Sequence, residues 1–131
     1  VDKDLGMISV PRIVNASAAG KIISPKLARN QVVGATVWGI GMALEEQAYI
    51  DPNFGRVMNS DLAEYHVPVL ADVQDIDVIL VDEKDDIVNP LGAKGIGELG
   101  MVGVAAAISN AIYNATGKRI RKLPITLDKL L

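Results

Sequence analysis

The sequence has 131 residues, half of them apolar, which is enough material for the hydrophobic core of one domain. Its net charge of -3 excludes general binding to nucleic acid, because such binding depends on a basic surface. With no cysteine and one histidine, His66, the chain cannot form disulfides, thiolate zinc sites, its own iron–sulfur clusters or a metal site with two histidine ligands. The longest apolar run, residues 32–44, is shorter than the ~20 residues that cross a bilayer, so no membrane association is expected.

The first residues indicate that the sequence is part of a longer protein. They contain no apolar signal segment, and residues 2–6 have the composition of a turn that joins two strands. The strand before that turn is missing, so we expect further chain on the N-terminal side. A cytoplasmic location is expected because no signal is visible, and the periplasm is the alternative.

The first half of the chain predicts one strand and one long helix. Alternating apolar residues favour a strand over residues 7–16, in which Pro11 requires an edge position or a bulge. A helix is expected from Pro25 or Lys26 to Ala48, with Ser24 as its N-cap and Pro25 in its first position. This helix is apolar nearly all round, so we expect it to be buried.

Three glycines lie inside this long helix. Gly34, Gly39 and Gly41 each cost a helix roughly 1 kcal/mol relative to alanine. We therefore expect another part of the chain, or a ligand, to approach the helix closely at these three positions.

The second half of the chain predicts a short strand and a second helix. Residues 51–55 predict a turn, residues 76–81 a strand, and residues 82–86 an acidic turn exposed to solvent. A helix is expected over residues 99–115 and ends at Gly117. Two long helices and few strands favour an α+β fold, with two buried helices on a small, mostly antiparallel sheet.

A glycine-rich segment, residues 92–100, precedes the second helix and is the strongest candidate for a functional loop. Glycines let main-chain N–H groups approach a ligand, and the start of a helix favours an anion. Lys94 would add a positive charge to such a site. Glu98 lies among apolar residues at the expected helix start, where it can be a helix cap or a general base. The residues alone leave both roles open.

The same segment contains the G-x-G-x-x-G spacing of the dinucleotide-binding fingerprint, over residues 95–100. The context disagrees, because residues 89–90, Asn-Pro, stand where a strand should lead into the first glycine. The acidic residue expected about 20 residues further on is replaced by the basic stretch 118–122. A nicotinamide dinucleotide-binding domain is therefore an alternative, as is a non-catalytic interaction module.

Three segments form a recognisable pattern when they are taken together. Residues 19–25 are a loop of small, basic and aliphatic residues that ends in proline, and residues 31–41 are a helix with a glutamine followed by glycines. Residues 94–98 are a glycine loop that ends in glutamate. In this order they resemble the large, molybdenum-binding subunit of the xanthine dehydrogenase and aldehyde oxidase family, with Ser24 where asparagine is common. Residues 111–113, 117–121 and 123–126 are similar to the C-terminal segment of that subunit. The resemblance therefore implies that this chain is the C-terminal part of the subunit.

The resemblance implies a molybdenum hydroxylase that oxidises an aldehyde or an N-heterocycle with oxygen derived from water. The implied cofactor is a molybdopterin, in bacterial members usually the cytosine dinucleotide form, whose own sulfurs hold the molybdenum. No residue of this chain is expected to be a metal ligand, and Glu98 is implied as the catalytic base. The residues implied to hold the cofactor are Lys21, Ile22, Ile23, Ser24, Pro25, Lys26, Leu27, Gln31, Lys94, Gly95, Ile96 and Gly97.

The resemblance also implies partners. The molybdenum subunit of this family is several times longer than this chain, so the missing N-terminal part of the same subunit is expected to complete the site. The fragment alone is expected to be inactive. Electrons are expected to leave through 2Fe-2S clusters to FAD on partner subunits or domains, and a homo-oligomer is an open alternative.

Overall fold

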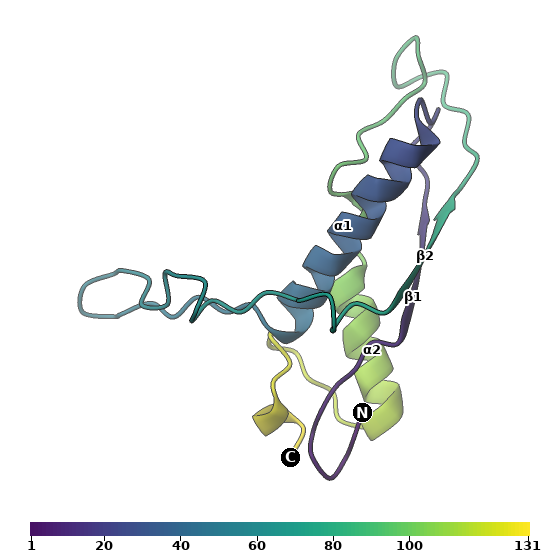
Figure 1. The fold of residues 1–131 in the computed structure, drawn as a ribbon. Coiled ribbons are helices and arrows are strands. Elements are labelled where there is room, and N and C mark those ends of the chain that lie inside the picture. The colour runs from purple at the N-terminus through teal and green to yellow at the C-terminus, as the bar shows by residue number, and fades with distance from the viewer.

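The computed structural model describes all residues, 1–131. The elements in chain order are β1 (Arg12–Ser17), α1 (Pro25–Leu44), β2 (Asp75–Leu80), the short 3₁₀ helix η1 (Leu99–Met101), α2 (Val104–Thr116) and the 3₁₀ helix η2 (Leu127–Lys129). The two α-helices pack against each other, and both strands lie along one side of α1 (Figure 1). Residues 45–74 form an arm that extends sideways from this body (Figure 1). None of the helices has both the length and the apolar character that a bilayer crossing requires.

The sheet consists of two parallel strands, so the expected antiparallel arrangement is wrong. Parallel neighbours need a crossover connection of a dozen or more residues, and α1 together with the arm provides it. Antiparallel pairing is limited to two isolated bridges, which join Gly20 to Ala93 and Ile50 to Val57. The expected small α+β fold with two helices is confirmed.

Helix ends follow local signals only in part. Pro25 occupies the first turn of α1, and Gly117 ends α2 with φ of 75°, both as expected. Ser24 stands at the N-cap of α1 but makes no side-chain capping hydrogen bond. α1 stops at Leu44 rather than Ala48, because the N–H groups of the next two residues both donate to the carbonyl of Gly41.

The two other boundaries also differ from the expected ones. β1 begins at Arg12 rather than residue 7, directly after Pro11, which has no N–H to donate to a ladder. The second helix was expected from residue 99, but residues Leu99–Met101 form the 3₁₀ helix η1 and α2 begins only at Val104. The glycine-rich segment therefore leads into one tight turn, not into an α-helix.

α1 is buried on one face only, which corrects the expectation of a helix buried all round. Trp38 and Met42 are 46% and 37% exposed. At Gly39 an added Cβ would lie 2.5 Å from the Cβ of Val104, so glycine does permit close packing of α2 there. At Gly34 nothing lies within 4 Å, and the expected close approach is absent. The buried face is made mostly of small residues: Ala28, Val32, Ala35, Thr36, Gly39, Ile40, Gly41 and Ala43.

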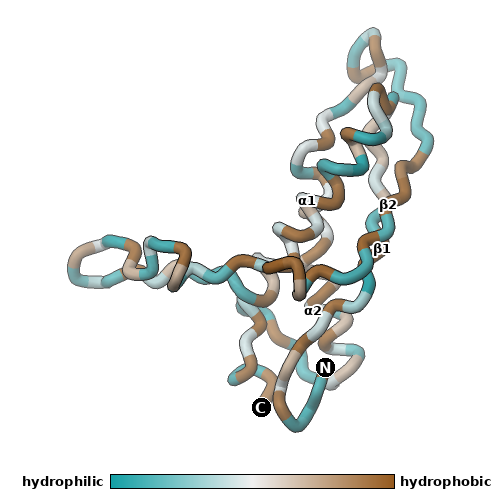
Figure 2. Tube along the Cα trace, in the orientation of Figure 1, coloured by the Kyte–Doolittle hydropathy of each residue, from teal (hydrophilic) through white to brown (hydrophobic).

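The hydrophobic core lies at the C-terminal end of α1, between this helix, α2 and the C-terminal segment. It comprises Ile40, Ala43, Val104, Ile108, Ile112, Ile125 and Leu130. Apolar residues also lie on the surface, including along the arm (Figure 2). This core fixes the C-terminal end of α1. Around the N-terminal end the buried apolar residues are Ala19, Ala28 and Val32, and the loops there are also joined by hydrogen bonds and ion pairs.

Candidate functional site

The loop before α1 meets the glycine-rich segment at the N-terminal end of this helix. We call residues 19–24 the pre-helix loop. The N–H of Lys21 donates to the carbonyl of Gly92 at 2.7 Å, and the N–H of Lys94 donates to the carbonyl of Ala19 at 3.0 Å. Two segments far apart in the sequence are thereby joined backbone to backbone.

Glycine is required on both sides of this junction. Gly20 has a φ of 62°, and a Cβ on it would lie 2.1 Å from the carbonyl oxygen of Gly92. Gly92 itself has a φ of 71°, and its Cβ would lie 2.8 Å from the carbonyl oxygen of Asp85. Any residue larger than glycine at either position would cost free energy, because the backbone is left-handed and another backbone segment lies in contact.

A pocket of about 190 Å³ opens between the two segments and the first turns of α1. Gln31 lies on α1 close to Gly97, since a Cβ added to that glycine would be 3.9 Å from the Gln31 Oε1. Four of the residues expected to hold a cofactor, Pro25, Lys26, Gly95 and Gly97, are not part of the pocket lining. The others line it: Lys21, Ile22, Ile23, Ser24, Leu27, Gln31, Lys94 and Ile96.

Five main-chain N–H groups in or beside this pocket have no hydrogen-bond partner within the chain. In the first turn of α1 this is the ordinary state of Lys26 and Leu27, whose N–H groups precede the first helical bonds. In the glycine-rich segment it also holds for Gly95, Ile96 and Gly97. Such a set of donors suits a ligand with phosphate or carbonyl oxygens.

The fold itself does not require glycine at position 95. Its φ is not positive, and nothing lies within 4 Å of a Cβ built on it. Gly97 has no positive φ either, and a Cβ added to it would meet only the Gln31 side chain. The missing side chains therefore leave free space beside unpaired N–H groups, where a ligand can approach the main chain.

Lys94 does not supply the free positive charge expected of it. Its Nζ lies 2.7 Å from the Glu83 Oε1 and 2.9 Å from the Asp85 Oδ2. The hydrogen bond to Lys94 lowers the pKa of the Glu83 carboxyl, and together with bonds from backbone N–H groups it lowers that of Asp85 to about 2. Both carboxylates in turn raise the pKa of Lys94. The cations that remain are Lys21, which lines the pocket, and Lys26 in the adjoining first turn of α1. Both are exposed and take part in no ion pair.

The acidic turn, residues 82–86, is only in part the solvated turn that was expected, because Asp82, Lys84 and Asp86 are exposed but Glu83 and Asp85 are half-buried. The Glu83 and Asp85 side chains are 31% and 24% exposed, and both point to Lys94. Sequence reasoning missed these two residues because their partner lies across a loop. An acidic cluster followed within a dozen residues by a lysine in a glycine loop is the only local signal.

Glu98 lies at the end of the glycine-rich segment, immediately before η1. Its side chain is exposed, so the apolar surroundings expected from its neighbours are not present in this chain. It makes no side-chain capping hydrogen bond and belongs to none of the ion pairs. Glu98 therefore stands at the N-cap of η1 without a capping hydrogen bond from its side chain, and this geometry favours neither the helix cap nor the general base.

Asn15 is a second residue that sequence reasoning missed. Its Nδ2 donates to the carbonyl of Gly100 at 2.7 Å and to the Thr36 Oγ1 at 3.0 Å, and its Oδ1 accepts from the Ser17 hydroxyl at 3.0 Å. β1, α1 and η1 are tied together by this one side chain. A polar residue at an inward-facing strand position was the available signal.

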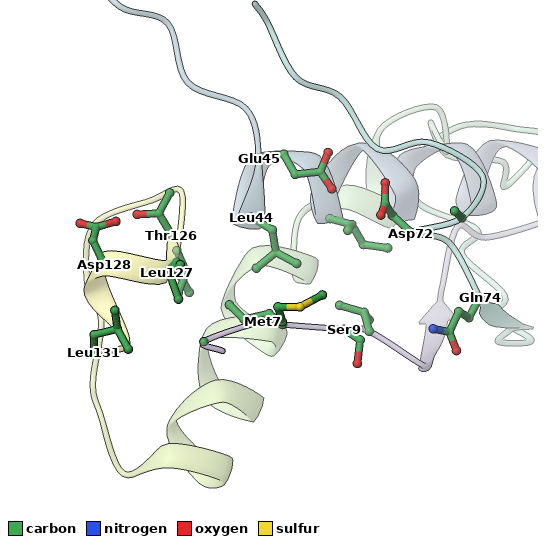
Figure 3. Close-up of a pocket in the computed structure, with 16 residues that line it drawn as sticks. Met7, Ser9, Leu44, Glu45, Asp72, Gln74, Thr126, Leu127, Asp128 and Leu131 are labelled. Carbon is green, nitrogen blue, oxygen red and sulfur yellow. The ribbon is translucent and has the colours of Figure 1, made fainter. Parts of the chain in front are cut away.

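A larger cavity of about 790 Å³ lies at the other end of α1, between the N-terminal and C-terminal segments (Figure 3). The charged residues that line it, Glu45, Asp72 and Asp128, are all acidic. Burial raises the pKa of Glu45, and the nearby charges of Asp72 and Glu46 add to this effect. None of the expected site residues lines this cavity, and its charge is unsuited to an anionic ligand.

The nicotinamide alternative lacks the structural context that its fingerprint needs. β2 ends at Leu80, well before Gly95, and no strand runs into that glycine. No α-helix starts at the end of the motif either, because η1 intervenes.

Comparisons with known proteins place the chain in a family. The family described as "Molybdopterin cofactor-binding domain" matches residues 1–74. The aldehyde oxidoreductase molybdenum-binding subunit PaoC of Escherichia coli K12 is 52% identical over 96% of this chain and 17% of its own length. The putative xanthine dehydrogenase molybdenum-binding subunit XdhA of the same organism is 38% identical over 99% of this chain and 17% of its own length.

A solved structure of the same group of enzymes is also similar to this chain. The aldehyde oxidoreductase of Desulfovibrio desulfuricans has a TM-score of 0.86 and 32% identity, over 100% of this chain and 14% of that one. The chain thus spans only about a sixth of the relatives that it matches. It belongs to the molybdopterin cofactor-binding domain family, within the group of the xanthine dehydrogenases and aldehyde oxidoreductases.

Proposed function

We propose that this chain is the C-terminal part of the molybdenum-binding subunit of a molybdenum hydroxylase, and that residues 1–131 form one continuous piece of its cofactor-binding domain. The proposed enzyme hydroxylates an aldehyde or an N-heterocycle with oxygen derived from water. The names of the relatives, an aldehyde oxidoreductase and a xanthine dehydrogenase, support these two substrate classes. Because the chain spans 17% of their length, the rest of the subunit would have to complete the active site.

The observation that carries the proposal is the set of unpaired N–H groups at Gly95, Ile96 and Gly97, beside a pocket lined by the pre-helix loop and Gln31. A molybdopterin dinucleotide carries phosphate and carbonyl oxygens, which these donors are suited to bind. Lys21 and Lys26 would balance the phosphate charge. We propose the cytosine dinucleotide form, with the exposed amide of Gln31 as a polar contact.

The residues present therefore fit this cofactor. When bound, it supplies the redox chemistry of molybdenum, which is held by the sulfurs of the cofactor itself. A chain without cysteine is compatible with that arrangement. The full set of residues proposed to hold the cofactor is Lys21, Ile22, Ile23, Ser24, Pro25, Lys26, Leu27 and Gln31, together with the main chain of Lys94, Gly95, Ile96 and Gly97.

Glu98 is the proposed general base. Its carboxylate is exposed and unpaired, and it directly follows the three residues with free N–H groups. In this role it removes the proton from the water-derived nucleophile as that oxygen attacks the substrate carbon. Contacts between the cofactor and the main chain of residues 95–97 would keep the carboxylate near the reacting centre.

Electron acceptors complete the proposal. We propose that electrons leave through 2Fe-2S clusters to FAD on partner subunits. The names of the relatives, which are molybdenum-binding subunits, support a division into separate chains. A cytoplasmic location stays a prediction.

The test uses Gly95→Ala and Gly97→Ala in the full-length subunit with its partners. The Cβ at Gly95 meets no atom of the chain and neither residue has a positive φ, so both variants should fold. The added methyl groups should obstruct the cofactor and lower the molybdenum and pterin content of the purified protein. Gly34→Ala, on the exposed side of α1, is the matched control and should keep the wild-type content. Full cofactor content in both loop variants, or a wild-type subunit without molybdopterin, would contradict the proposal.

A further inference from the structure

The Glu83 side chain connects two loops with its two oxygens. Its Oε2 accepts the N–H of Gly20 at 2.8 Å, and its Oε1 accepts the Lys94 ammonium at 2.7 Å. One carboxylate therefore holds both the pre-helix loop and the glycine-rich segment. These are the two segments between which the 190 Å³ pocket opens.

Asp85 provides a second support for Lys94. Its Oδ2 lies 2.9 Å from the Lys94 Nζ, while its Oδ1 accepts the N–H groups of Ile87 and Val88 at 2.9 Å and 3.0 Å. Because the carboxylate is fixed by its own turn, it offers a rigid anchor rather than a mobile surface charge. We call Glu83, Asp85 and Lys94 the clamp.

The charge of the clamp argues against a direct role of Lys94 in binding an anion. Two carboxylates face one ammonium, so the group as a whole is negative. A cofactor phosphate placed against Lys94 would have to compete with both carboxylates for its donors. Lys94 is thus better suited to hold its own backbone in place than to contact the cofactor through its side chain.

We propose that Glu83 and Asp85 are positioning residues for the cofactor site, which act through Lys94 to hold residues 93–97 against the pre-helix loop. The inference rests on the proposed function and extends it to two residues outside the expected site. With the clamp intact, the free N–H groups of Gly95 to Gly97 keep a fixed position relative to Gln31. With the clamp broken, the segment can move away and the cofactor should dissociate faster.

The test compares Glu83→Gln, Asp85→Asn and Lys94→Met in the full-length holoenzyme. The readout is the time course of pterin loss, followed by pterin fluorescence after oxidation of the released cofactor. All three variants should lose pterin several-fold faster than wild type. The triple variant should be no worse than the worst single variant, because the three side chains act as one unit. Lys94→Arg, which keeps two charge-assisted bonds, should restore most of the retention.

The controls separate positioning from general stability. Lys84 and Asp86 form an ion pair of 3.0 Å in the same turn, but their side chains are 84% and 73% exposed. Lys84→Met should therefore leave both pterin retention and the melting temperature unchanged. The clamp variants should lose pterin faster than wild type at temperatures well below their own melting temperatures, so that global unfolding does not account for the loss.

A direct contact between Lys94 and the cofactor would give a different result. If Lys94 binds the cofactor directly, removing either carboxylate frees its charge, and Glu83→Gln or Asp85→Asn would slow pterin loss while Lys94→Met accelerates it. That outcome, or unchanged retention in the carboxylate variants of a loaded enzyme, overturns the positioning role alone. A wild-type enzyme without molybdopterin overturns the proposed function, and this inference with it.

Discussion

The junction between the pre-helix loop and the glycine-rich segment is most directly disturbed by Gly20→Ala. A φ of 62° costs an alanine roughly 1–2 kcal/mol, because this conformation brings Cβ close to a carbonyl oxygen. The new Cβ would also lie 2.1 Å from the carbonyl oxygen of Gly92, and only a separation of the two backbones relieves that contact.

Such a separation weakens the two hydrogen bonds of the junction, from Lys21 to Gly92 and from Lys94 to Ala19. Each contributes about 1 kcal/mol net. Together with the backbone strain, we expect the local free energy of opening to fall by about 3–4 kcal/mol. The hydrophobic core lies at the other end of α1, so global unfolding should be less affected.

Amide hydrogen exchange of the full-length subunit measures this effect. The Lys21 and Lys94 amides should exchange about 100-fold faster or more in Gly20→Ala than in wild type. The control is Gly34→Ala, which has no neighbour within 4 Å and should leave these amides unchanged while stabilising α1 by up to about 1 kcal/mol. Wild-type protection of Lys21 in Gly20→Ala would refute the account of the junction.

Three further predictions concern single side chains. Asn15→Ala should destabilise the protein by about 1–3 kcal/mol in chemical denaturation, because the Gly100 carbonyl and Thr36 hydroxyl lose their donor; a loss below the measurement error would contradict this. Glu45→Gln should raise the melting temperature near pH 7, since a raised pKa means that the folded state disfavours the charged carboxylate. The gain should stay below about 1 kcal/mol for a group that is only partly buried, and it should vanish as the pH falls below 4.5; a gain that persists there would be inconsistent. Gln31→Ala should lower molybdenum and pterin content, and unchanged content would remove Gln31 from the site.

The ion pairs of the clamp stabilise the protein over a defined pH range. The stabilisation from Asp85, whose pKa is lowered from 3.8 to about 2, is complete above its ordinary pKa and is lost as the pH falls towards 2. The stabilisation from Lys94, whose pKa is raised above 10.5, is complete below that value and is lost at higher pH. Changes in activity near neutral pH therefore arise elsewhere than in the clamp.

Local signals in the sequence predicted the parts of the fold that depend on few neighbours. Pro25 and Gly117 mark helix ends because the fixed φ of proline suits a first turn and glycine readily adopts the left-handed conformation after a last turn. The direction of the strands depends instead on the path of the chain between them. An antiparallel sheet was expected because no crossover was recognised, although α1 lies between the two strands in the sequence.

Burial on α1 could not be predicted for a related reason. Helical periodicity shows that a face is apolar, but it does not show which face another element covers. α2 approaches at Gly39, where the missing side chain leaves room, and the larger Trp38 remains half exposed.

The candidate site was predictable as a set of segments, but not as a geometry. The resemblance placed the pre-helix loop, Gln31 and the glycine-rich segment in one site, and the structure brings these segments together. The resemblance could not show that Lys94 is held by Glu83 and Asp85, because ion pairs across loops leave little trace in the sequence. Nor could it show that Glu98 is exposed and stands before a 3₁₀ helix rather than an α-helix.

In the proposed enzyme this chain holds a molybdopterin and presents Glu98 as the base beside it. Glu98→Gln in the full-length subunit tests this proposal most directly, because the substitution keeps the size of the side chain and removes its ability to accept the proton. Molybdenum and pterin content should remain at the wild-type level, while turnover of an aldehyde or N-heterocycle falls by about 10²–10⁴-fold. Near-normal turnover by a fully loaded Glu98→Gln enzyme would contradict the account.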